Sequence, residues 1–285
     1  MRPLPGIVIT LATYEGGDPT GTPLLFIHGN SLAASIFERQ WADPELQSFR
    51  LVALDLPGHG QSPDAPEWYA PAQLRRVLVA AVRALGCEQA LVVAHSYGGH
   101  LALDVLPDLP ELLGLLLVGT PPVSTAPDLA AAFCLTETGG LFYAPTLTDQ
   151  QTTALARTCL RAGGDEDEVH LLEAALRRAD GRMRTALAAS IGAGELLDEV
   201  GIVADTARPL AFMLGQDDTL LNPAYFAGLT APSRWGEPVL LVPGAGHLPF
   251  LENPPAFQAL LLAFVAHASQ PASQPASQPH SKAIA

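Results

Sequence analysis

Short apolar runs that end at a glycine or a turn recur along this chain and alternate with segments of helical periodicity. Such runs occupy residues 23–29 (PLLFIHG), 49–58 (FRLVALDLPG), 90–96 (ALVVAHS) and 112–119 (LLGLLLVG). Between the second and third runs, residues 71–85 place apolar side chains at helical spacing: Leu74, Val77, Leu78, Ala81, Val82 and Leu85. Strands that alternate with helices form a parallel sheet covered on both faces. The sequence therefore predicts an α/β protein.

The alternation stops after residue 121 and resumes near residue 207. Residues from about 124 to 205 predict several helices rich in Ala and Leu, with glycine pairs at 139–140 and 163–164. Further strands are expected at 208–215 and 237–244, and a last helix over about 255–267. We therefore expect a core in two parts, residues 1–121 and 207–268, with a helical cap at 122–206 inserted between its strands.

The two ends of the chain differ in character. The first residues, MRPLPGIVITLATYEGG, contain only a short apolar stretch and no small-residue cleavage site, so we expect a first strand in a cytoplasmic protein. Residues 268–279 repeat the unit ASQP and hold almost no bulky apolar side chain. A disordered tail is therefore expected at 269–285. No apolar run reaches the ~20 residues of a membrane helix, so no membrane partner is expected.

The charge balance narrows the choice of partners. The chain has 29 acidic and 15 basic residues, a formal net charge of −14, and no cluster of Lys or Arg. We therefore expect no nucleic-acid partner, and a preference for neutral or cationic substrates over anionic ones. The three cysteines are scattered without metal-binding spacing, so no metal is expected, and the sequence indicates no cofactor. A monomer or a homodimer is expected.

Ser96, in the stretch VVAHSYGGHLAL, lies where a predicted buried strand meets a predicted helix. In a nucleophile elbow the residues two before and two after the nucleophile must be small, and here they are Ala94 and Gly98. The helix N-terminus would place backbone N–H groups near the serine oxygen. The alternative is a serine that only caps the helix. The elbow pattern favours Ser96 as a nucleophile.

An activated serine needs a general base, which in turn needs an orienting carboxylate. His247 lies in a glycine-rich loop directly after the strand expected at 237–244, at the sheet edge to which Ser96 also belongs. Asp217 and Asp218 follow the strand that ends at Gly215, which gives the chain order Ser, Asp, His. We predict His247 as the base and Asp218 as its carboxylate, because a Gly-x-x-Asp spacing is usual in such enzymes, and Asp217 as a solvated turn residue.

An acyl-transfer site must also stabilise a developing oxyanion with preorganised donors. The segment FIHGNS turns off a buried strand, so the backbone N–H of Asn30 can point inward, and the N–H of Tyr97 would be the second donor. The segment DLPGHGQS holds Asp55, His59 and Ser62 close together, but its glycines and proline are typical of a loop after a strand. We interpret these three residues as structural.

Together the stretches HGN, DLPGHGQS, AHSYGG, GQDD and GAGH resemble the α/β-hydrolase family, in order and spacing from about residue 7 to residue 267. The resemblance implies an α/β-hydrolase fold: a mostly parallel eight-stranded sheet flanked by helices, with an inserted helical cap. It places the family's catalytic triad on Ser96, Asp218 and His247. It implies hydrolysis of carboxylic esters through an acyl-enzyme, because Ser96 stands where related dehalogenases and epoxide hydrolases carry Asp.

A narrower resemblance joins HGNS, DLPGHG, GTPPV, ADGRMR and GAGHLPFLENP to the metal-independent N-acyl-homoserine lactonases of this fold. It implies a small neutral lactone substrate with an apolar acyl part, held in a pocket under the cap. Aromatic and aliphatic residues of the cap that would line this pocket, or else form its ordinary core, are Phe133, Leu135, Leu141, Phe142 and Tyr143.

Other functions use the same residues. A general carboxylesterase, a C–C bond hydrolase or a perhydrolase would share the triad, and a panel of acyl-homoserine lactones, aryl esters and dienone acids separates them. Some proteins of this fold are small-molecule receptors that keep the triad and barely turn over. Such a receptor would bind a partner in a ligand-dependent way without multiple turnover.

Overall fold

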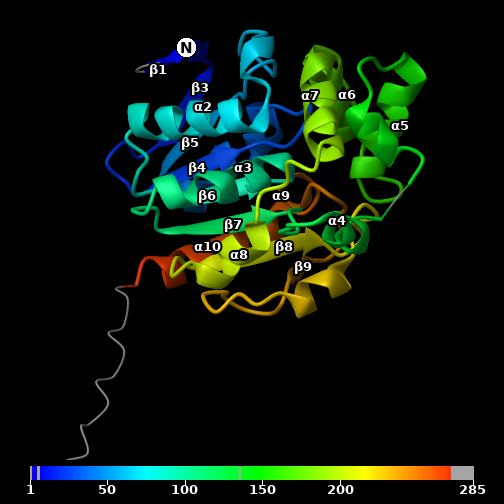
Figure 1. Ribbon diagram of the computed structural model, residues 1–285. Coiled ribbons are helices and arrows are strands. Elements are labelled where there is room, and N and C mark those ends of the chain that lie inside the picture. The colour runs from blue at the N-terminus through cyan, green and yellow to red at the C-terminus, as the bar shows by residue number, and fades with distance from the viewer. Residues whose placement is uncertain (1, 5–6, 135, 271–285) are drawn as a thin grey trace, which may run out of the picture.

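The computed structural model describes residues 2–4, 7–134 and 136–270, and within them a seven-stranded sheet forms the centre of the molecule (Figure 1). Its strand order is β3-β5-β4-β6-β7-β8-β9. The strands are β3 (Thr13–Gly17), β4 (Pro23–Ile27), β5 (Arg50–Leu54), β6 (Leu91–His95), β7 (Gly114–Val118), β8 (Leu210–Gly215) and β9 (Leu240–Val242). Only β3 is antiparallel to its neighbour. The predicted α/β fold with a mostly parallel sheet is confirmed.

The N-terminal segment forms three short strands where one was expected. Strands β1 (Arg2–Leu4) and β2 (Ile7–Leu11) pair with each other in a separate antiparallel sheet, and β3 follows. Between β2 and β3, the N–H of Ala12 donates to Ser62 Oγ at 2.9 Å and its carbonyl accepts from the N–H of Asp55 at 3.0 Å. Because Ala12 bonds to the loop after β5, the strand is interrupted there. The described main sheet therefore has seven strands rather than eight.

Helices cover both faces of the sheet. In Figure 1, α2 (Pro71–Ala84) and α3 (Tyr97–Val105) lie in front of it, and α10 (Pro254–Ala268) packs on β7 behind. The short helices α1 (Glu38–Trp41) and α9 (Pro249–Glu252) contact α10. The segments predicted as helices at 71–85 and 255–267 agree with α2 and α10 to within a residue at each end. Single 3₁₀ turns are η1 (Ala34–Phe37), η2 (Pro44–Leu46), η3 (Pro66–Trp68), η4 (Leu106–Asp108) and η6 (Pro223–Gly228).

A block of helices separates β7 from β8 in the sequence. It consists of α4 (Ala126–Ala132), η5 (Gly139–Tyr143), α5 (Asp149–Cys159), α6 (Glu166–Arg178), α7 (Gly181–Gly192) and α8 (Glu199–Asp205). Side chains that accept a backbone N–H of the first turn begin α4 to α8: Thr125, Thr148, Asp165, Asp180 and Asp198. Figure 1 shows α5, α6 and α7 beside one another at one end of the sheet.

The C-terminal helix α10 ends at Ala268. Most of the tail that the ASQP repeat predicts to be disordered, residues 271–285, lies outside the described residues. Within the described part of the chain, none of the helices combines the length and the apolar character that crossing a membrane requires.

Candidate active site

Ser96 lies in a strained turn between β6 and α3. Its backbone has φ 51° and ψ −123°, a region that side-chain-bearing residues rarely occupy. Its N–H donates to the carbonyl of Val118 at 2.8 Å. A Cβ on Gly98 would lie 2.5 Å from the carbonyl oxygen of His28, and Ala94 is fully buried. The small residues of the AHSYG segment are therefore required by close packing of the turn against β4.

His247 and Asp218 form a buried pair. His247 Nδ1 lies 2.7 Å from Asp218 Oδ2, and the two side chains are 6% and 2% exposed. Asp218 Oδ1 accepts the N–H of Leu220 at 2.8 Å. An ionised carboxylate only accepts hydrogen bonds, so the ring proton belongs on Nδ1 and Nε2 is left as an acceptor. Asp217 is exposed and takes no part in this pair.

One cavity of about 810 Å³ brings Ser96 and His247 together. Both predicted oxyanion residues, Asn30 and Tyr97, lie on its wall. Tyr97 is the first residue of α3, so its N–H has no acceptor within the helix. Much of the remaining wall comes from apolar side chains of the helical block and neighbouring segments: Val123, Leu129, Leu187, Ile191, Leu196, Leu197 and Leu220.

Three of the five cap residues predicted to line a pocket do so: Phe133, Phe142 and Tyr143. The prediction for Leu141 is corrected: its side chain packs against the hydrophobic core and does not line the cavity. In the 3₁₀ turn η5, residues three apart share a side, so Gly139 and Phe142 line the cavity, as do Gly140 and Tyr143. Leu141 lies on the third side of this turn, which does not face the cavity. Leu135 lies outside the described residues.

The polar part of the cavity wall carries acidic groups and, among the residues that the structure describes, no Lys or Arg. Asp104, Glu195 and Glu199 line it together with His100. Glu199 accepts from the N–H of Val123 at 2.9 Å, and its carboxylate lies 2.9 Å from His100 Nδ1. Burial raises the pKa of Asp104, although Arg75 opposes this shift at 2.7 Å. Among the described residues, no three His, Cys, Asp or Glu side chains are arranged to hold a metal ion.

The loop of His247 is held from the helical block and from α9. The N–H of His247 donates to the carbonyl of Cys159 at the end of α5, at 2.8 Å. The half-buried carboxylate of Glu252 accepts the N–H groups of Gly246, at 2.7 Å, and Arg161, at 2.6 Å. Burial raises the pKa of Glu252. The sequence analysis missed these supports; its only signal was an acidic residue within GAGHLPFLENP.

Three further residues support Ser96 and His247. Gly119 has φ 63°, and a Cβ there would lie 2.8 Å from His247 Cε1. Thr120 Oγ1 donates to the carbonyl of Ser96 at 2.9 Å. His95 Nε2 bonds to the carbonyl of His247 at 3.0 Å, and burial and the His247 ring lower the pKa of His95 well below its usual value. The GTPPV segment after a strand was the available signal for Gly119 and Thr120.

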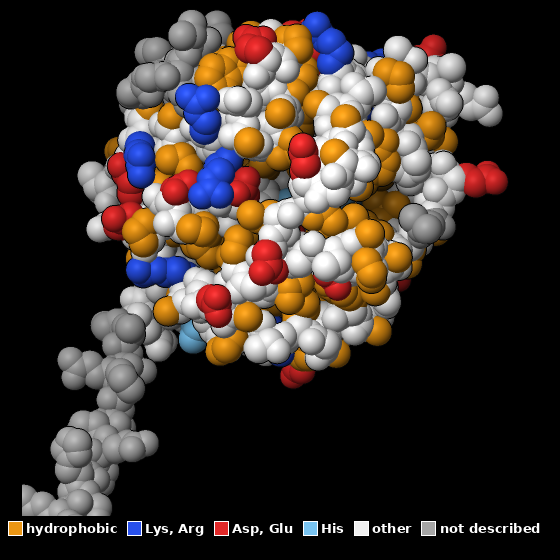
Figure 2. All heavy atoms as spheres, viewed as in Figure 1, with side chains coloured by type: hydrophobic (Ala, Val, Ile, Leu, Met, Phe, Trp, Pro, Cys, Tyr) orange, Lys and Arg blue, Asp and Glu red, His pale blue; other side chains and the backbone are white. Residues whose placement is uncertain are grey.

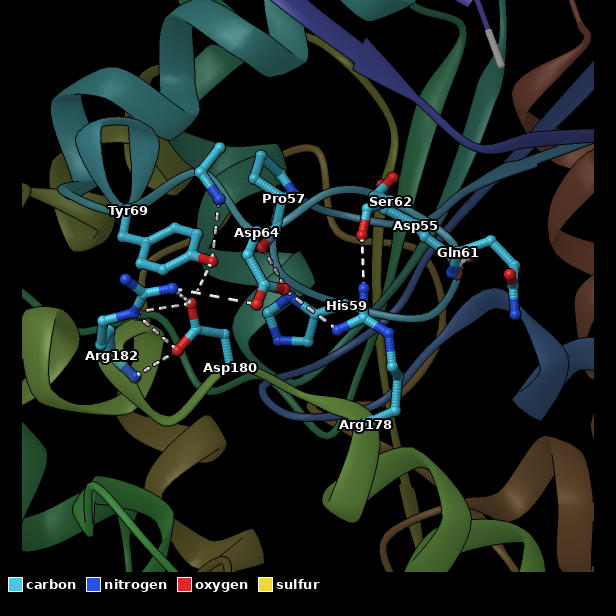
Figure 3. A network of polar contacts seen from close by, with 11 residues as sticks. Asp55, Pro57, His59, Gln61, Ser62, Asp64, Tyr69, Arg178, Asp180 and Arg182 are labelled. Carbon is cyan, nitrogen blue, oxygen red and sulfur yellow. Dashed lines mark hydrogen bonds and ion pairs between the residues drawn. The ribbon is translucent and has the colours of Figure 1, made fainter.

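The DLPGHGQS loop uses its polar side chains to fix the backbone (Figure 3). Asp55 Oδ1 accepts the N–H of Ala34 at 2.7 Å, and Ser62 Oγ donates to the carbonyl of Asp55 at 2.6 Å. His59 Nε2 accepts the N–H of Ser31 at 3.1 Å. Burial, chiefly, lowers the pKa of His59 to about 3, so the ring is neutral. None of these contacts joins the loop to Ser96.

Comparison with known families gives one family match. A model of the alpha/beta hydrolase family matches residues 24–260, which run from the second residue of β4 through β9 and the helical block into the first half of α10. A pimeloyl-[acyl-carrier protein] methyl ester esterase of Stenotrophomonas maltophilia is 28% identical over 255 residues, which are 87% of this chain and 95% of that protein.

Solved structures of the N-acyl homoserine lactonase AidH are similar over nearly the whole chain. A mutant complexed with N-hexanoyl homoserine lactone superposes with a TM-score of 0.85 at 27% identity, covering 95% of this chain and 99% of that one. A complex with N-butanoyl homoserine gives a TM-score of 0.84 at 28% identity, covering 93% and 96%.

Proposed function

Because the chain belongs to the alpha/beta hydrolase family and is an enzyme that hydrolyses ester bonds, we propose that it opens the ring of N-acyl homoserine lactones with Ser96 as nucleophile. His247 is the general base in this proposal and Asp218 orients it. The N–H groups of Asn30 and Tyr97 stabilise the oxyanion, and the block at 122–206 is a cap that holds the acyl chain.

In the first half of the reaction Ser96 Oγ attacks the lactone carbonyl while His247 Nε2 takes its proton. The carbonyl oxygen becomes an oxyanion held by the two N–H groups. The C–O bond of the ring then breaks, and His247 returns the proton to the departing alkoxide. Because the alcohol belongs to the ring, it stays attached to the acyl-enzyme.

In the second half, His247 takes a proton from water, whose oxygen attacks the acyl-enzyme carbonyl through a second oxyanion. Ser96 leaves and recovers its proton from His247. The product is N-acyl homoserine, one water heavier than the lactone. Asp218 keeps the Nδ1 proton in place throughout and stabilises the imidazolium that forms in each half.

One observation carries this proposal: the apolar cavity that holds Ser96 and His247 extends among α4, η5 and α7 of the helical block. Its volume of about 810 Å³ lies in the range of ligand pockets. The neutral lactone ring of the substrate would lie at Ser96, and its apolar acyl chain would lie along the apolar wall that the helical block provides. The similarity to a lactonase over 95% of the chain supports the same substrate class.

The test measures ring opening of N-butanoyl, N-hexanoyl and N-dodecanoyl homoserine lactones near pH 7, with phenyl acetate as a comparison ester. We expect N-acyl homoserine as the product by mass spectrometry, with one ¹⁸O from labelled water in its carboxylate. Ser96→Ala should lower the rate by about 10⁴-fold or more. Lactone turnover no faster than that of the aryl ester contradicts the lactone proposal, and high activity of Ser96→Ala contradicts the mechanism.

A carboxylesterase is the second candidate, and the methyl ester esterase from S. maltophilia favours it. The same triad would release methanol from a methyl ester instead of opening a ring. Competition between a methyl ester and a lactone of equal acyl length decides between the two, because both would occupy the same cavity. A higher kcat/KM for the methyl ester favours the esterase.

A further inference from the structure

The ADGRMR segment contains a buried arginine that the proposed mechanism does not use. Arg184 is only 3% exposed. Within the described part of the chain, no carboxylate lies within ion-pair distance of it, and burial lowers the pKa of its guanidinium. Burying a cation without a paired anion costs desolvation free energy, so hydrogen bonds to the guanidinium must offset that cost.

The guanidinium of Arg184 bonds to oxygens of two separate segments. Nε donates to the carbonyl of Ala144 at 2.6 Å and Nη2 to that of Pro145 at 3.4 Å, both directly after η5. Nη1 donates to Ser31 Oγ at 3.1 Å. Ser31 follows Asn30 and has a positive φ of 59°. Arg184 thus joins the wall of the cavity to the loop after β4.

The hydroxyl of Ser31 links Arg184 to Asn30, because it accepts one hydrogen bond and donates another. Since guanidinium groups only donate, Ser31 Oγ must accept from Arg184, and its own hydrogen goes to Asn30 Oδ1 at 3.0 Å. The amide of Asn30 is thereby turned so that Nδ2 donates to the carbonyl of Phe142 at 2.9 Å. Phe142 is two residues before Ala144, which Arg184 contacts, so the hydrogen bonds and the backbone between these two residues form a closed ring. We call these residues the Arg184 network: Arg184, Ser31, Asn30, Phe142 and Ala144.

The rest of the ADGRMR segment brings Arg184 to this position. Asp180 caps α7, and Gly181 lies so close to Pro145 that a Cβ would be 1.7 Å from its carbonyl oxygen. Only glycine lets the first turn of α7 approach the segment after η5 in this way. Met183 is fully buried and fixes the helix against the core.

We propose that Arg184 is a positioning residue for the reaction: through Ser31 it fixes the side chain of Asn30 at both ends and so aims the Asn30 backbone N–H at the oxyanion. This inference rests on the proposed function, in which Asn30 supplies that N–H. The oxyanion forms in both halves of the reaction, so loss of the alignment lowers kcat and kcat/KM together. Misplacement of a group by about 1 Å can lower a rate by about 10²-fold.

The test compares Arg184→Met, Arg184→Lys and Ser31→Ala with the wild type, on p-nitrophenyl acetate and octanoate. Arg178→Met is the matched control, because Arg178 also joins the helical block to the core, but its hydrogen bonds go to Ser62 and Asp64 (Figure 3) and not to Ser31. We expect a fall of about 10- to 100-fold in kcat and kcat/KM for Arg184→Met, shared by both esters. Arg184→Lys keeps the positive charge but lacks the planar set of N–H donors of a guanidinium. Its kcat and kcat/KM should therefore lie between those of Arg184→Met and the wild type. Arg178→Met should stay within about twofold.

Ser31→Ala keeps the backbone conformation and removes only the hydroxyl, so it decides the matter if Arg184→Met does not fold. A fall of about 10-fold or more in Ser31→Ala supports the proposal. If Arg184→Met also folds, the losses of the two variants should not be additive in the double variant. Folded variants with kcat and kcat/KM within about threefold of the wild type overturn it. A loss confined to the octanoate ester also overturns it, since that would mean a damaged acyl pocket.

Ser96→Ala, measured alongside, tests the proposed function by itself. Activity retained in Ser96→Ala contradicts the nucleophile, whatever the Arg184 variants do. Activity lost in Ser96→Ala but kept in folded Arg184→Met and Ser31→Ala contradicts only the positioning role. The two failures are therefore distinguishable.

Discussion

At the scale of single residues, the surroundings of each histidine separate the candidate base from the rest. His95 and His59 are closer in sequence to Ser96, but both are buried, and in each a ring nitrogen is hydrogen-bonded to a backbone group. Two histidines pair Nδ1 with a buried carboxylate and line the cavity of Ser96: His100 with Glu199, and His247 with Asp218. His100 lies within α3, whereas His247 lies in the loop after β9, at the carboxyl end of a strand. Its selection from sequence used only its place after a strand, and that place puts it beside Ser96.

The neighbours Asp217 and Asp218 offer a matched pair of substitutions. Asp218→Asn should keep the bond from the Leu220 N–H but turn an amide NH₂ toward His247, which forces the proton from Nδ1 to Nε2. We expect kcat to fall by about 10³- to 10⁴-fold. Asp217→Asn, at an exposed side chain, should change kcat by less than about twofold. Steady-state kinetics on one ester checks both, and equal effects would refute the assignment.

Gly119 should be sensitive for two separable reasons. Gly119→Ala places a methyl group 2.8 Å from His247 Cε1 and strains a residue at φ 63°. Gly163→Ala is the control, since Gly163 has φ 71° and open space around it. We expect both variants to lose about 1–2 kcal/mol of unfolding free energy from the backbone, as denaturant titration would show. Only Gly119→Ala should also lower kcat, by about 10-fold or more; an equal kcat in both would show that the ring is not displaced.

At the scale of elements, hydrogen bonds of Asp180 join the start of α7 to the core (Figure 3). Asp180 accepts from Tyr69 Oη at 2.7 Å and pairs with Arg182 at 2.7 Å. The N–H of Asp180 donates to the carbonyl of Gly58 at 2.8 Å. Burial would raise the pKa of Asp180, but the bonds from Arg182 and Tyr69 outweigh it and hold that pKa at about 2.

This contact gives the helical block a pH-dependent attachment. The pKa of Asp180 is lower in the folded protein than its ordinary value of 3.8, so its stabilisation is present above pH ~4 and is lost as the pH falls toward 2. We expect the stability difference between wild type and Asp180→Asn to shrink over that window. Asp149→Asn, at an exposed acid, should show no such change. Urea unfolding at a series of pH values tests this, and a constant difference from pH 5 to pH 2 would contradict it.

Elements with a strong pattern could be predicted, and those fixed by distant contacts could not. The ends of β4 to β8 are marked by apolar runs and glycines, which placed Ser96 and Asp218 at strand ends. The break at Ala12 depends on Ser62, fifty residues away, and had no local signal. The direction of the Leu141 side chain follows from the three-residue period of the 3₁₀ segment η5. The sequence did not distinguish this period from that of an α-helix.

At the scale of the whole molecule, the excess of acidic groups extends into the cavity. Figure 2 shows several Arg side chains gathered over α2, on the outside of the fold. Among the described residues, the cavity wall carries Asp104, Glu195 and Glu199 but no Lys or Arg. The local field therefore has the sign that the net charge of −14 suggests.

Substrates with an anionic tail should be rejected for this reason. We expect a monoester whose acyl chain ends in a carboxylate to have a kcat/KM at least about 10-fold below that of a neutral ester of equal length. Added salt should narrow the gap, because it screens the exposed part of the field. Replacing Glu195 by Gln, which leaves the pairing of Glu199 intact, should narrow it as well. Equal kcat/KM for the two esters at low salt would refute the idea.

The parts of the site that could be read from sequence are those that follow strand ends. Position along the sheet edge placed Ser96, Asp218 and His247 in order, because carboxyl ends of parallel strands share one edge. The contacts of Cys159 with His247, of Glu252 with Arg161 and of Arg184 with Ala144 could not be read, because they join backbone groups to segments that meet only when the helical block packs. Those contacts depend on how the block folds back over the sheet.

Two serines keep a backbone conformation that glycine would adopt at less cost. Within the described residues, Ser31 and Ser96 are the non-glycine positions with positive φ. Glycine at either would relieve strain of about 1–2 kcal/mol, so each serine lowers the stability of the fold it belongs to. Backbone strain of this kind clusters at functional sites. The backbone conformation therefore agrees with the proposed roles of both hydroxyls, the one at the proposed nucleophile and the one beneath Asn30.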